Sequence, residues 1–169
     1  MGEVLRKMEA LLKREGLVAQ DRPAFPNLED LINYGLKDAV KTGRYVWFDM
    51  ECIYDTKDYE LILAGFEKKC GNKNQFEILS VYFDNDAEKA GIKIRVNGKE
   101  FEGGWSQQSD WVAGEFFAIV DEFNKVLKGR YVSLLIDQDY RAVYIDDRLV
   151  ADELESLFKG AFDEWLKSE

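Results

Sequence analysis

The sequence predicts a single α+β domain in which helices pack on an antiparallel or mixed sheet of about five to six strands. Apolar residues recur at helical spacing at both ends of the chain, β-branched and aromatic runs lie between them, and no βαβαβ alternation occurs. The length of 169 residues suits one domain over 1–169, with a helical N-terminal part over 1–43 and a sheet with helices over 44–169.

The N-terminal part predicts two helices joined by an extended connector. Apolar residues recur at helical spacing up to Gly16, which stands at a C-terminal cap position, so a helix is expected over 2–15. The connector 17–26 contains both prolines. Asn27 is the predicted N-cap of a second amphipathic helix that ends before Gly43.

The next part of the chain predicts a strand, a helix and a second strand. Residues 44–54 are rich in aromatic and β-branched side chains, which favours a strand. The spacing over 59–70, closed by Gly71, suits a helix, although the run 61–63 also fits a strand. Residues 76–83 alternate as a strand does.

The clearest local signal is the dipeptide Asn97-Gly98 between two alternating runs. This pair favours a two-residue type I′ turn, because both central positions require a positive φ. The register that follows places Ile94 opposite Phe101, so that an apolar pair falls on one face of a hairpin.

A break in regular structure is predicted after this hairpin. Gly103 and Gly104 are the only glycine pair in the chain and indicate a bend between strand and helix. Trp105 then falls in a predicted loop, where a large aromatic side chain often contacts a partner. A regular apolar stripe within 112–127 predicts the next helix.

The C-terminal part predicts a second hairpin and a last helix. Residues 131–136 and 141–145 form its two strands around an aspartate-rich turn. Asp152 is expected to begin the last helix, with Glu155 three places on, at the capping-box position.

The absence of histidine removes several classes of enzyme. Without it there is no Ser-His-Asp or Cys-His catalysis, no HExxH zinc site and no His-ligated metal or haem. Cys52 and Cys70 are too few for a zinc site and are expected to be reduced thiols. We therefore expect no catalytic residues, no metal site and no cofactor.

The remaining motifs match known sites only in part. Neither GxGxxG nor GxxxxGK[ST] occurs. Residues 84–88 begin like a calcium loop, but Lys89 and Arg95 stand where glycine and glutamate are required. Residues 67–69 match the E-x-K pattern of some nucleases, but on a predicted helix rather than a strand. A carboxylate- or metal-dependent enzyme stays open as an alternative.

The acidic charge points to a basic partner. The net charge of −10 argues against nucleic acid or an anionic membrane as partner. Residues 45–90 and residues 130–169 each carry ten acidic and five basic side chains. The candidate partner-binding residues are acids of predicted turns and one aromatic side chain: Asp84, Asp86, Glu88, Trp105, Asp137, Asp139, Asp146 and Asp147.

The function expected from this profile is that of an acidic protein-binding inhibitor. Small acidic single domains without catalytic constellations have the profile of bacterial immunity proteins, which neutralise toxins such as nucleases by covering a basic site. The alternative is a small-ligand-binding or scaffold module without catalysis. No apolar signal region or membrane-spanning run is found in the sequence, so a cytoplasmic location is expected.

Overall fold

Two antiparallel three-stranded sheets form the framework of the computed structural model, which describes residues 2–168. The strands are β1 Tyr45–Asp49, β2 Phe76–Asp84, β3 Lys89–Val96, β4 Lys99–Ser106, β5 Arg130–Ser133 and β6 Asp139–Ile145. The first sheet has the order β1-β6-β5, and the second has the order β2-β3-β4.

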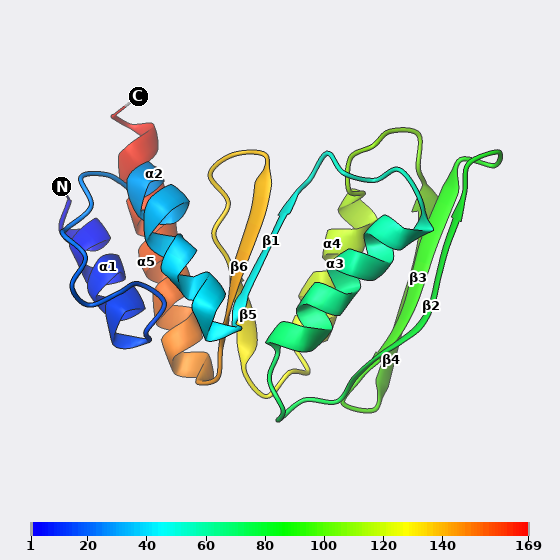
Figure 1. The fold of residues 1–169 in the computed structure, drawn as a ribbon, viewed down its shortest axis with the longest axis horizontal. Coiled ribbons are helices and arrows are strands. Elements are labelled where there is room, and N and C mark those ends of the chain that lie inside the picture. Colours follow the sequence, from blue (N-terminus) through cyan, green and yellow to red (C-terminus); the bar gives the residue numbers. More distant parts are fainter. Residues whose placement is uncertain (1, 169) are drawn as a thin grey trace.

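The helices form two further layers. They are α1 Glu3–Arg14, α2 Leu28–Asp30, η1 Leu31–Gly35, η2 Leu36–Thr42, α3 Thr56–Lys69, α4 Gly114–Asn124 and α5 Arg148–Leu166. Figure 1 shows α3 and α4 between the two sheets, while α1, α2 and α5 cover the other face of the first sheet. The order of elements along the chain is the predicted one.

The α+β class is confirmed, but the predicted single sheet of five to six strands is not, because α3 and α4 separate the strands into two sheets. Aromatic side chains of α3 and α4 pack against both sheets. Phe66 of α3 meets Tyr131 and Tyr140 of the first sheet edge-to-face. Phe123 of α4 meets Phe76 of the second sheet in the same way. A helix pair that is buried on two sides holds two sheets apart.

The second N-terminal helix is irregular. Asn27 caps it as predicted, because its side-chain oxygen accepts a hydrogen bond from the backbone N–H of Asp30 at 2.7 Å. The helix then continues as one π-helical segment, η1, and one 3₁₀ segment, η2, and ends at Gly43 with φ of 69°.

The Asn97-Gly98 hairpin is confirmed, with φ of 49° and 85° at the two turn residues. The predicted register also holds, since Ile94 pairs with Phe101. The Asn97 side chain donates to the carbonyl of Val126, which anchors the turn to the segment after α4.

The predicted break at Gly103 and Gly104 is wrong, because β4 runs through both residues. A Cβ atom at Gly103 would lie 2.8 Å from Ile119 of α4, and one at Gly104 would lie 2.7 Å from the hydroxyl of Tyr82. These glycines therefore admit close neighbours within a strand rather than ending it.

The predicted start of the last helix is also wrong. Asp147 is its N-cap and accepts a hydrogen bond from the backbone N–H of Leu149 at 2.9 Å. Asp152 and Glu155 lie inside α5, where both pair with Arg130 of β5. These two acids have the spacing of a capping box, but they form ion pairs on the helix surface and do not cap the helix.

The first sheet is shared by two hydrophobic cores. Val143 and Ile145 of β6 pack in the core that α1 and α5 cover. Tyr140, Ala142 and Tyr144 of the same strand point the other way, into the core that contains α3 and α4. Burial of β6 on both faces explains its nearly continuous apolar sequence.

Candidate protein-binding surface

Four connections lie at one end of the molecule: β1–α3, β2–β3, β4–α4 and β5–β6 (Figure 1). Backbone hydrogen bonds tie them together. The N–H of Met50 donates to the carbonyl of Gln138 at 3.2 Å, and the N–H of Ile53 donates to that of Asp110 at 2.7 Å. The N–H of Gln107 donates to the carbonyl of Glu88 at 2.8 Å. The four connections therefore form one continuous surface.

This surface is strongly acidic. It is built from residues 49–58, 84–88, 107–113 and 134–139, in which Lys57 is the only lysine or arginine. We call its ten carboxylates the acidic edge: Asp49, Glu51, Asp55, Asp58, Asp84, Asp86, Glu88, Asp110, Asp137 and Asp139. Within residues 2–168, only the last two of these take part in an ion pair.

Several of these carboxylates are held in place by the backbone. Asp58 accepts hydrogen bonds from the N–H groups of Tyr54 and Asp55 at 2.8 and 2.9 Å. Asp84 accepts one from the N–H of Ala87 at 2.9 Å. Carboxylates that are already ordered lose little conformational entropy when they meet a cationic partner.

The structure brings five of the predicted site residues onto this surface, but in two different states. Asp84 is the last residue of β2, and Asp86 and Glu88 lie in the turn that follows it; none of the three makes an ion pair with any residue in 2–168. Asp137 and Asp139 share the buried Arg141, at 2.7 and 2.9 Å. Part of their charge is therefore neutralised within the chain.

The carboxyl of Asp137 shows the effect of this pairing. Burial opposes its ionisation, but hydrogen bonds from Arg141 and from the backbone N–H of Asp139 outweigh burial and lower the pKa of Asp137. The carboxylate of Asp137 is thus charged and is paired with Arg141 of the same chain.

Asp146 and Asp147 lie elsewhere. They follow the last residue of β6, whereas Asp139 is its first residue, so the two pairs stand at opposite ends of one strand. Asp147 caps α5, and Asp146 lies 3.8 Å from Lys73. The fold therefore does not unite these two residues with the acidic edge.

The prediction that Trp105 lies in a loop is wrong. Trp105 belongs to β4 and is buried, with its ring edge-on to Tyr59 at a centroid distance of 5.3 Å. Its indole N–H donates to the side-chain oxygen of Gln107 at 3.0 Å. Trp105 is thus a core residue.

Two exposed aromatic side chains beside the acidic edge were missed by the sequence reasoning. Tyr54 and Trp111 are 66% and 41% exposed. They stand on adjacent segments, because Glu51 and Trp111 form an antiparallel bridge. Partial loss of hydration and the nearby carboxylates of Asp110 and Glu51 raise the pKa of Tyr54. Each is adjacent to one aspartate in the sequence, Tyr54 to Asp55 and Trp111 to Asp110, and this is the signal that could have marked them.

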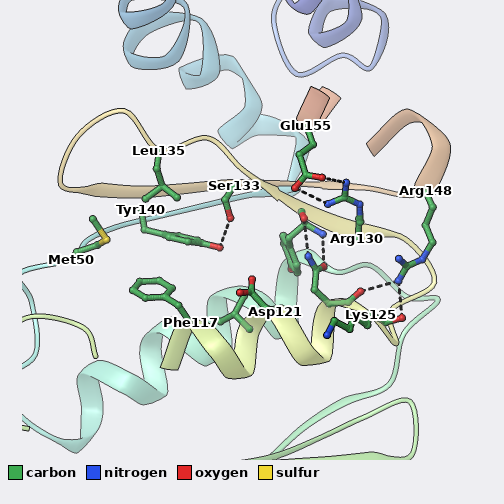
Figure 2. Close-up of a pocket in the computed structure, with 13 residues that line it drawn as sticks. Met50, Phe117, Asp121, Lys125, Arg130, Ser133, Leu135, Tyr140, Arg148 and Glu155 are labelled. Atoms are coloured by element: carbon green, nitrogen blue, oxygen red, sulfur yellow. Dashed lines mark hydrogen bonds and ion pairs between the residues drawn. The ribbon is translucent and has the colours of Figure 1, made fainter. Parts of the chain in front are cut away.

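A cavity of about 520 Å³ lies between α4 and the edge strand β5 (Figure 2). One end is apolar and is lined by Met50, Phe117 and Leu135. Ser133 and Tyr140 meet there through their hydroxyls at 3.0 Å. The volume falls in the range of small-ligand pockets.

The cationic groups at the other end of this cavity are engaged by the chain itself. Arg130 pairs with Asp152 and Glu155, each at 2.8 Å. Arg148 donates to the backbone carbonyls of Asn124, Lys125 and Leu127 at the end of α4. Lys125 pairs with Glu122 of the same helix. These contacts join α4, β5 and α5, which accounts for the charged side chains at this end of the cavity.

The two cysteines are free thiols. Burial raises the pKa of each to about 11, so both are protonated near neutral pH. Within residues 2–168 there is no group of three or more side chains suited to hold a metal ion. In the same part of the chain, no helix combines the length and apolar character needed to cross a membrane.

Comparison with known proteins found no match to this chain among protein-family models, curated proteins or solved structures.

Proposed function

We propose that this protein binds a basic protein partner through the acidic edge and inhibits it by covering a functional basic site, as an immunity protein neutralises its toxin. The observation that carries the proposal is the exposed pair Tyr54 and Trp111, set among carboxylates on connections tied by hydrogen bonds. Exposed aromatic anchors within a charged surface are typical of protein-binding sites.

The two kinds of side chain have different roles in this proposal. The unpaired carboxylates attract a cationic surface over several ångströms and raise the rate of association. Tyr54 and Trp111 supply contact area at a low entropic cost, which slows dissociation. A nuclease toxin fits this chemistry, because a site that binds phosphates is itself basic.

The second candidate function is binding of a small ligand in the cavity of Figure 2, which its volume and its mixed apolar and polar lining favour. We rank it below protein binding because the cations at its polar end already have partners.

The test compares two double charge reversals with the same change in net charge. Glu51→Lys with Asp110→Lys alters the acidic edge, and Glu67→Lys with Asp163→Lys is the control on exposed helix positions. The partner is first captured from the native host and purified, and association rates are then measured by surface plasmon resonance at low and high salt. We expect the first pair to slow association about tenfold or more, and the control to have little effect.

Tyr54→Ala should chiefly accelerate dissociation in the same experiment. Equal rates for the two double variants, or a partner whose own activity is unchanged when it is bound, would refute the proposed function.

A further inference from the structure

A second cavity, of about 730 Å³, runs along the free edge of β1 between η2 and α3. β1 is an edge strand, since it stands at the end of the order β1-β6-β5. Val40 of η2, Trp47 of β1 and Leu61 of α3 line this groove and are 58%, 56% and 61% exposed. Three large apolar side chains from three elements therefore face solvent in one groove.

The backbone of β1 is arranged to accept another strand. Arg44 accepts a hydrogen bond from Tyr144 of β6, and Met50 donates one towards β6 at Gln138. In an antiparallel pair, the N–H and C=O groups of successive residues point alternately towards the partner strand and away from it. Because Arg44 bonds to β6, the N–H and C=O groups of Tyr45 and Trp47 point away from β6, into the groove. Such a row of groups is a template for strand addition.

Gly65 gives a second, independent indication. It stands in the middle of α3 and lines the groove. A Cβ atom there would meet nothing nearer than Val46, at 4.0 Å, so packing within the chain does not require glycine. A mid-helix glycine lowers helix stability, and here its effect is to leave open space beside the β1 edge.

Five charged side chains line the groove. Asp58 and Asp139 lie at the end where β1 finishes; Arg141 pairs with Asp139 there, whereas Asp58 makes no ion pair within residues 2–168. Lys37 of η2 lines the wall of the groove. Lys69, the last residue of α3, lines the end where β1 begins, because α3 runs back from the acidic edge (Figure 1). An occupant with a cation at one end and an anion at the other is complementary to it.

We propose that this groove takes an extended segment of another protein as a fourth strand of the first sheet, antiparallel to β1. The segment has apolar residues at alternate positions, a basic residue near its N-terminal end beside Asp58, and an acidic residue near its C-terminal end beside Lys69. The site shares two carboxylates with the acidic edge, but it does not depend on the function proposed for that surface.

A lone segment fits better than a second copy of this chain. Each copy carries η2 and α3 on the two sides of β1. A single extended strand needs less space between these walls than the β1 strand of a second copy, which brings its own two helices to within the strand spacing of about 4.8 Å.

The test uses two synthetic hexapeptides with blocked termini. The probe is Arg-Val-Thr-Ile-Thr-Glu, and the control Glu-Val-Thr-Ile-Thr-Arg has the same composition with the charges exchanged. Binding is followed by NMR on the ¹⁵N-labelled full chain. We expect the probe to bind about tenfold more tightly than the control, since its charges match both ends of the groove. Amide exchange should slow at Tyr45 and Trp47, and stay unchanged at Val46 and Phe48, which already face β6.

Two variants block the groove in different ways. Leu61→Arg changes an exposed wall residue, and Gly65→Leu fills the space beside β1; Leu149→Arg, at an exposed leucine of α5, is the matched control. We expect each groove variant, but not the control, to weaken probe binding about tenfold or more.

Binding that survives both groove variants overturns the proposal. So does the absence of saturable probe binding up to about 1 mM. A dimer in sedimentation experiments that Leu61→Arg dissociates would assign the groove to a second copy and also overturn it.

Discussion

At the residue scale, Gln107 organises the β4–α4 connection. Its side-chain oxygen accepts hydrogen bonds from Tyr59 and Trp105 at 2.8 and 3.0 Å. Its side-chain nitrogen donates to the carbonyls of Ser109 and Trp111 at 2.6 and 2.8 Å. One buried amide thus satisfies two donors of the core and fixes the segment that carries Trp111 at the surface.

Gln107→Leu should therefore lower the free energy of unfolding by about 2 to 3 kcal/mol, because it leaves buried donors and acceptors without partners. Urea unfolding followed by circular dichroism measures this. Gln108→Leu is the control, since that side chain is exposed and donates to Glu88 at the surface at 3.1 Å. Equal stability of the two variants would show that Gln107 does not have this organising role.

At the scale of single elements, the start of α5 shows how a cap is chosen. The sequence offers acids at Asp146, Asp147 and Asp152, and only the second is the N-cap. β6 ends at Ile145, so the chain must turn immediately, and the N-cap Asp147 lies five residues before Asp152, the predicted start. The end of the preceding strand thus determines which aspartate caps the helix.

Asp147→Ala should cost about 1 kcal/mol of stability through loss of this cap. Asp146→Ala should change stability by less than about 0.5 kcal/mol, because that exposed side chain makes only a surface pair with Lys73. Thermal unfolding of both variants provides the comparison, and a larger effect at Asp146 would contradict the assignment of the cap.

At the scale of the whole molecule, the first sheet couples the two hydrophobic cores. Because β6 contributes side chains to both, neither core can lose its packing without exposing a face of the same strand. We therefore expect one cooperative unfolding transition for the whole chain.

The expectation can be tested with one leucine in each core. Leu154→Ala lies in the core of α1 and α5, and Leu63→Ala lies in the core of α3 and α4. Each should cost about 2–5 kcal/mol and shift a single calorimetric transition. If one variant splits the transition and leaves part of it at the wild-type temperature, the two cores are independent.

Much of the local structure could be predicted from the sequence alone. Helical periodicity placed the helices in order, and the turn at Asn97-Gly98 and the cap at Asn27 were correct. These features depend on the conformational preferences of a few adjacent residues, so a short stretch of sequence is sufficient to predict them. Of the candidate site residues, Asp86, Glu88 and Asp137 lie in connections between strands, whereas Asp84 and Asp139 are terminal residues of β2 and β6.

Tertiary structure alone decided the rest. It divided six strands into two sheets around α3 and α4, buried Trp105, and ran β4 through Gly103 and Gly104. It also gathered ten carboxylates from four connections around two exposed rings, and left β1 with a free edge. Each of these outcomes depends on which distant segments pack together, and contacts between distant segments leave no periodic pattern in either of them.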